Sequence, residues 1–172
     1  MRAPFLWPWL SQTGRAYRLG YVTRRKAMTQ RLDYRALSPD GVKGLFASQP
    51  YLIKTLPRPF LDMIWIRVSQ INGCAYCVDQ HVKDALQHGS NERKLHHVSI
   101  WWESPLFDAK EQAALAYAEA VTRLEHQRVA EDVYQAAKAQ FDDRTLTDLT
   151  IAIVAMNAWN RLAIAMCKGA PA

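Results

Sequence analysis

Apolar residues recur along much of the chain at intervals of three and four, the spacing of helices that bury one face. The pattern is clearest between the prolines at 57 and 59 and the Asn72-Gly73 pair. Its apolar positions are Leu61, Ile64, Trp65, Val68 and Ile71. We therefore predict a helix from Phe60 that buries this face and stops at Asn72-Gly73, where glycine interrupts the pattern.

Further helices are predicted from residues that favour helix ends. Ser38 followed by Pro39 predicts a helix start, because proline suits the first helical position. Asp108 and Glu111 have the spacing of a capping box. The other predicted helices run from Cys74 to Gly89, from Asn91 through His96 and His97, and over about residues 130 to 140. Because no strand alternation or internal repeat stands out, the predicted fold class is all-α.

The last apolar segment, TLTDLTIAIVAMNAWNRLAIAM, covers residues 145 to 166 and is apolar on nearly all sides. Such a helix is predicted to be central in the fold or to lie at a subunit interface. Polar groups lie within it and need hydrogen-bond partners; they belong to Asn157, Trp159, Asn160 and Arg161. We expect them to fix helix packing or an oligomer contact rather than to bind substrate.

Composition limits the class of protein. The chain has 172 residues, 49% of them apolar and 22% charged, which suits one globular domain. Its net charge of +6 comes from residues 1–27, which hold six basic residues and no acidic one. The remaining basic and acidic residues balance, which argues against a nucleic-acid-binding groove. No apolar run approaches the roughly 20 residues needed to span a bilayer, so no transmembrane segment is expected.

Residues 1–27 are interpreted as a basic N-terminal extension, disordered or targeting, and residues 28–172 as the helical domain. The extension is a poor secretory signal and resembles an organellar transit peptide better. Alternatives are a membrane-surface segment anchored by apolar residues at 5–9, or an upstream start with Met28 as the working one. We expect a cytoplasmic protein, or one of an organellar matrix if the extension is a transit peptide.

The stretch NGCAYCVDQH, residues 72–81, carries the candidate chemistry. With Cys167, the chain has three cysteines, too few for a disulfide framework and consistent with a reducing compartment. On a helix that starts near Cys74, positions 74, 77 and 81 fall on one stripe. The free N–H groups at a helix start stabilise a thiolate, and His81 can take its proton. Cys167 is interpreted as a bystander thiol.

Other sites can use the same residues. Zinc can bind Cys74, Cys77 and His81, but a structural site needs four ligands, and His88, His96 or His97 would have to fold back. Haem attachment requires histidine directly after the second cysteine, where Val78 stands. A thioredoxin fold requires a strand before the motif. The plainest alternative is a pair of small buried thiols in a helix core.

The span LDMIWIRVSQINGCAYCVDQHVKDAL, residues 61–86, resembles the signature of AhpD-like alkylhydroperoxidases in the carboxymuconolactone decarboxylase superfamily. The similarity extends from Leu32 to Ile164 and includes RLDYRALSP and NAWNRLAIA. The family motif is a glutamate, eleven residues, Cys-X-X-Cys, three residues and a histidine, and Cys74, Cys77 and His81 match it in place. Decarboxylase branches of the superfamily lack the cysteine pair, so the resemblance favours the redox branch.

The resemblance implies a thiol-dependent peroxidase that assembles as a homo-oligomer. Carried over, Cys77 attacks the hydroperoxide and becomes a sulfenic acid, Cys74 donates a proton and closes the disulfide, and His81 belongs to the proton relay. It implies a dithiol or lipoyl-type protein as reductant, and no cofactor beyond the redox-active disulfide Cys74–Cys77. The alternative, from another class, is a non-catalytic redox-sensing or assembly protein whose disulfide alters its oligomer contacts.

One position departs from the family pattern. Where the motif has glutamate, this chain has Asp62, which keeps the carboxylate but shortens its reach by about 1.5 Å. Either the relay is rebuilt with a water between Asp62 and His81, or Asp62 is a solvated helix residue. Tyr76 and Ser69 can each offer a hydroxyl to the site, and we expect packing roles for both.

Overall fold

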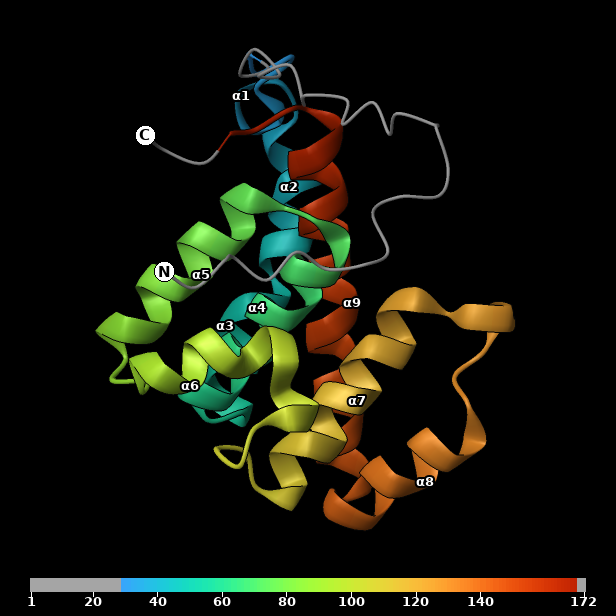
Figure 1. Ribbon diagram of the computed structural model, residues 1–172. Helices are drawn as coiled ribbons and strands as arrows, with labels where there is room; N and C mark the ends of the chain where they lie inside the picture. Colours follow the sequence, from blue (N-terminus) through green and yellow to red (C-terminus); the bar gives the residue numbers. More distant parts are fainter. Residues whose placement is uncertain (1–28, 170–172) are drawn as a thin grey trace, which may run out of the picture.

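The computed structural model describes residues 29–169, which are helical without an assigned strand in that range. The all-α prediction is therefore confirmed. Two short 3₁₀ helices, η1 and η2, accompany the α-helices (Figure 1). The elements are α1 (Tyr34–Leu37), α2 (Pro39–Phe46), α3 (Ser48–Thr55), α4 (Arg58–Asn72), α5 (Ala75–Gln87), α6 (Glu92–His97), η1 (Val98–Glu103), α7 (Ala109–Arg123), η2 (Glu125–Gln127), α8 (Glu131–Gln140) and α9 (Asp143–Ala165).

The long helix α9 is central, as its apolar sequence predicts. It contacts α2, α3, α4, α5, α7 and α8. In Figure 1 it runs beside α2, with α5 on one side and α7 and α8 on the other. Its buried residues include Leu149, Ile153 and Met156, which join the same core as Leu61 and Ile64 of α4. A helix surrounded in this way must be apolar on most of its circumference.

Helix α4 is buried more completely than one apolar face predicts. Every residue from 61 to 69 is buried, because α4 packs against α5, α7 and α9 at once. Of the predicted apolar positions, only Ile71, near the end of the helix, is partly exposed. The predicted start at Phe60 is two residues late, since the helix begins at Arg58 and accepts Pro59 in its first turn. Proline is tolerated there because first-turn N–H groups have no helical partner.

A two-residue connection joins α4 to α5 and places the cysteines. Gly73 ends α4 with φ +71°, a left-handed conformation that glycine adopts at no steric cost, and its N–H donates to the carbonyls of Ser69 and Gln70. Cys74 follows at once as the N-cap of α5. The predicted stop at Asn72-Gly73 and the helix start at Cys74 are both confirmed.

The other predicted helix ends agree with the structure to within two residues. The capping box at the start of α7 is formed, with Asp108 accepting from the N–H of Glu111 and Glu111 accepting in return. Helix α8 occupies the predicted range, and α9 begins at Asp143, two residues before the predicted segment. The predictions for residues 1–27, and for Met28 as a start, lie outside the described residues. Among the described helices, none is long and apolar enough to cross a membrane.

Candidate active site

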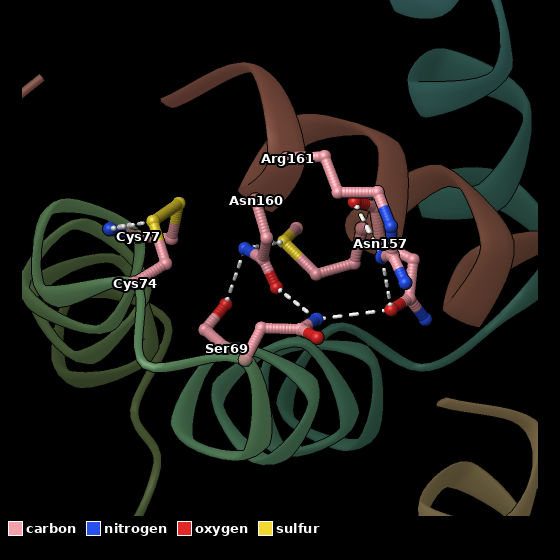
Figure 2. Close-up of a disulfide and its surroundings, with 8 residues drawn as sticks. Ser69, Cys74, Cys77, Asn157, Asn160 and Arg161 are labelled. Atoms are coloured by element: carbon pink, nitrogen blue, oxygen red, sulfur yellow. Dashed lines mark hydrogen bonds between the residues drawn. A yellow bond between two sulfur atoms is a disulfide. The ribbon is translucent and has the colours of Figure 1, made fainter. Parts of the chain in front are cut away.

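The two cysteines of the motif form a disulfide at the N-terminus of α5 (Figure 2). Their Cα atoms are 5.3 Å apart, as one helical turn allows. Cys74 Sγ accepts a hydrogen bond from the backbone N–H of Cys77 at 3.4 Å, so this sulfur caps the helix. Free N–H groups and the helix dipole at this end favour negative charge on sulfur when the pair is reduced.

Both sulfurs are buried, yet one side of the pair meets an open groove. Cys74 is 2% exposed and Cys77 5%, and Ala163 of α9 packs against them. Tyr76 packs beside the pair, as expected, with the Lys168 ammonium 4.3 Å from its ring centre. The groove has a volume of about 760 Å³, and Cys74, but not Cys77, contributes to its wall. It is lined by Ser69, Gln70, Gly73, Cys74, Ala75, Val78, Asp79, Val82 and Lys83.

His81 is buried one turn beyond Cys77 on the same helix, as the spacing predicts. Its ring packs against Trp65 of α4 with ring centres 5.0 Å apart, and Trp65 is itself held by its Nε1–H, which donates to the Ala152 carbonyl. Burial lowers the pKa of His81 from 6.5 to about 4, a shift that the Asp84 carboxylate opposes and the Arg58 guanidinium increases. The imidazole is therefore neutral near pH 7 and able to accept a proton.

Asp62 is fully buried, which rules out the interpretation of a solvated helix residue. Its two carboxylate oxygens accept from Arg58 Nε at 3.0 and 3.1 Å, and Nδ1 of His88 lies 3.2 Å from Oδ2. Burial raises the pKa of Asp62 above its ordinary value, although Arg58 and His88 oppose the rise. Asp62 thus pairs with Arg58 and lies against His88, while the carboxylate nearest His81 belongs to Asp84.

Arg58 and Asp84 belong to this charged cluster but were not predicted from the sequence as site residues. Arg58 precedes Asp62 by four positions and Asp84 follows His81 by three, spacings that place each pair on one helix face. Those spacings were a usable signal. His88 was considered only for zinc; among the described residues no group of three or more His, Cys, Asp or Glu side chains is arranged to hold a metal ion.

A chain of polar side chains joins α4 to α9 beside the cysteines (Figure 2). Asn160, which is fully buried, donates to Ser69 Oγ at 3.0 Å and accepts from Asn72 at 2.8 Å. Asn72 also donates to Asn157, whose oxygen accepts in addition from Arg161. These contacts confirm the packing role predicted for Asn157, Asn160 and Ser69, whereas Arg161 is exposed and bonds only within α9. They also hold the last turn of α4, from which the Cys74 segment starts.

Comparison with known proteins finds relatives in sequence and in fold. The carboxymuconolactone decarboxylase family matches residues 48–120. The uncharacterized protein YdfG of Bacillus subtilis strain 168 is 34% identical over 140 residues, which cover 81% of this chain and 95% of that protein. A crystal structure from Agrobacterium tumefaciens, of a protein of unknown function to which an antioxidant defence role as AhpD has been attributed, is 35% identical. It superposes with a TM-score of 0.80 over 83% of this chain and 99% of that one.

A more distant structure shares the fold alone. The debrominase Bmp8, crystallised with 2,3,4-tribromopyrrole, is 18% identical over 80% of this chain and 74% of that one, with a TM-score of 0.73. The family match, the extent of the YdfG similarity and the AhpD-like fold around a Cys-X-X-Cys pair all agree. The chain belongs to the carboxymuconolactone decarboxylase family, as one of its AhpD-like members.

Proposed function

We propose that this protein is a thiol-dependent peroxidase that reduces hydroperoxides with Cys74 and Cys77. The observation that carries the proposal is the disulfide at the N-terminus of α5, one turn from a buried, neutral His81. A helix start favours the thiolate, and a neutral imidazole can accept the thiol proton. The fold does not decide the reaction, because the debrominase shares it. The proposal rests on the side chains.

In the oxidative half of the cycle, Cys77, Cys74 and His81 have distinct roles. The Cys77 thiolate attacks the outer oxygen of ROOH, the O–O bond breaks, and Cys77 becomes a sulfenic acid while RO⁻ takes a proton to leave as ROH. The Cys74 thiol then attacks the Cys77 sulfur and displaces water, which forms the disulfide. His81 accepts the proton released when Cys77 ionises and returns it to the leaving alkoxide.

The reductive half requires a dithiol partner, because the disulfide must be opened by thiolate exchange. We propose that the partner's thiolate attacks Cys74, since this sulfur lines the open groove and Cys77 does not. The attack releases the Cys77 thiolate, and the partner's second thiol then closes its own disulfide and frees Cys74. Both sulfurs are at most 5% exposed, so a slender arm such as a lipoyl group suits the groove better than a protein surface.

The proposal includes a homo-oligomer, as the family resemblance implies, and a reducing compartment that keeps the partner dithiol reduced. That compartment is the cytoplasm, or an organellar matrix if residues 1–27 are a transit peptide. The competing function is a redox sensor whose disulfide alters oligomer contacts. One contact favours the sensor as the second candidate. The disulfide packs against Ala163 of the central helix α9, so its formation can shift the packing of that helix.

The deciding experiment is turnover of cumene hydroperoxide with dihydrolipoamide as reductant. An enzyme consumes many equivalents of peroxide, whereas a sensor is oxidised once and stops. Cys74→Ser should form a sulfenic acid on Cys77 that dimedone traps, and Cys77→Ser should not. Cys167→Ser is the matched control and should retain turnover, because Cys167 is a free thiol outside the pair. Single-equivalent oxidation of the wild type, without turnover, would reject the enzyme in favour of the sensor.

A further inference from the structure

His81 carries a ring nitrogen that needs a partner. Nδ1 is buried and makes no hydrogen bond to the described residues. Leaving such an atom unpaired costs about 1–3 kcal/mol, so a working site should supply a hydrogen-bond partner. The carboxylate that faces it is Asp84, whose Oδ2 lies 3.9 Å from Nδ1, one turn further along α5. A small side-chain rotation, or one bridging water, closes this distance.

Asp84 is held with one oxygen directed to His81. Gln80, one turn earlier, donates to Oδ1 at 3.0 Å, which leaves Oδ2 as the oxygen on the His81 side. A terminal nitrogen of Arg58 lies 3.8 Å from the same Oδ2. Arg58 therefore stands between two carboxylates, with its Nε on Asp62 and its terminal nitrogen toward Asp84. Asp84 lies at the edge of the site, where its side chain is 25% exposed.

Asp62, by contrast, already has partners for its carboxylate oxygens. Both of its oxygens accept from Arg58, and Oδ2 also lies against His88. We propose that Asp84, not Asp62, is the positioning residue of His81: Oδ2 of Asp84 accepts the Nδ1 proton and leaves Nε2 as the basic nitrogen. Asp62 acts one step further away, by fixing Arg58. This inference rests on the proposed function for its chemical purpose, although its geometry stands without it.

The assignment gives the proton a defined path. Nδ1 keeps its proton throughout, Nε2 accepts the proton of the Cys77 thiol, and the Asp84 carboxylate stabilises the imidazolium that results. The charged groups that act on His81 are Arg58 from α4 and Asp84 from α5; Asp62 pairs with Arg58, and His88, directly after α5, lies against Asp62. Of these, Asp84 raises the pKa of His81 against the effect of burial, whereas Arg58 lowers it.

The first test reads the tautomer of His81 directly. In the full chain labelled with ¹⁵N-histidine, wild-type His81 should show a protonated Nδ1 and an unprotonated Nε2 near neutral pH, with the resonance assigned by His81→Gln. Asp84→Ala, which suits a helix interior, should lose this preference, and Asp62→Asn should keep it. Loss of the preference in Asp62→Asn with retention in Asp84→Ala, or retention in both, overturns the proposal.

The second test reads the chemistry without requiring turnover. In a Cys74→Ser, Cys167→Ser background, iodoacetamide reacts with Cys77 alone. Asp84→Ala should slow this reaction at pH 7 by about tenfold, part of the 10²–10⁴-fold associated with a positioned base, and shift its pH profile upward. Asp132→Ala, which removes an exposed carboxylate from α8, is the control and should leave rate and profile unchanged.

Further measurements distinguish failure of the Asp84 assignment from a folding defect and from failure of the proposed function. If Asp84→Ala lacks the wild-type circular dichroism spectrum, both measurements are made on Asp84→Asn, which keeps the side-chain volume and the contact with Gln80. An alkylation profile equal to wild type in that variant refutes the role of the charge. Failure of the wild-type protein to turn over hydroperoxide would reject the peroxidase and leave the tautomer and alkylation results to decide on Asp84.

Discussion

Acid should weaken the fold through His81, and the size of the effect follows from its burial. The pKa of this imidazole is lowered from 6.5 to about 4 in the folded protein. The unfolded chain then binds a proton that the folded protein refuses, so the contribution of His81 to stability is complete above pH 6.5 and is lost as the pH falls toward 4. A pKa gap of about 2.5 corresponds to roughly 3 kcal/mol, at about 1.4 kcal/mol for each unit.

The measurable part of this effect lies between pH 7 and pH 4.5. Linkage gives a loss of about 2 kcal/mol in unfolding free energy over that range from His81 alone. Asp62 acts in the opposite direction, because its raised pKa makes the folded state take up a proton more readily as the pH falls. Comparing wild type with His81→Gln removes that contribution, since Asp62 is present in both proteins.

The assay is urea unfolding at pH 7.0, 6.0, 5.0 and 4.5, followed by circular dichroism, on wild type, His81→Gln and His96→Gln. His81→Gln should lose about 2 kcal/mol less than wild type over this range. His96→Gln should follow the wild type, because the His96 side chain is 72% exposed. If wild type and His81→Gln lose stability in parallel, His81 is not a buried neutral base, and the proposed acceptance of the Cys77 proton fails with it.

Three further predictions concern a buried hydrogen bond, a buried ion pair and the disulfide. Asn160→Ala should cost about 2–3 kcal/mol in unfolding free energy, because it leaves the buried Ser69 hydroxyl without its partner and removes one bond of Asn72. Val154→Ala, on the exposed side of α9, should stay within about 0.5 kcal/mol. Arg67→Met should cost about 3 kcal/mol by leaving the mostly buried Glu119 carboxylate without its principal partner, and a Glu119→Gln double variant should recover part of that loss; full additivity would contradict the pairing. A peptide map after mild oxidation should contain the Cys74–Cys77 disulfide with Cys167 still alkylatable, and a peptide joined through Cys167 would contradict it.

Local sequence was sufficient for the helices and for the arrangement of the cysteine pair. Gly73 ends α4 because its backbone adopts a left-handed conformation there, and a capping box such as that of Asp108 acts within one turn. The spacing of 74, 77 and 81 places two thiols and an imidazole on one stripe of α5, whatever lies around that helix. Each of these features depends on neighbours within about two helical turns, which a sequence displays directly.

Tertiary structure decided which side chains of different helices meet. The burial of α4 on every side comes from helices that follow it in the chain, and the bond between Ser69 and Asn160 joins residues 91 positions apart. Asp62 was one candidate for a carboxylate at His81, but it pairs with Arg58 one turn earlier on α4, and Asp84 lies nearest the imidazole, one turn further along α5. Only the approach of His88 to Asp62 depends on how α5 packs against α4. A carboxylate pairs with the cation nearest in space. Because aspartate is shorter than the glutamate of the family motif, the partner that Asp62 reaches depends on about an ångström of packing.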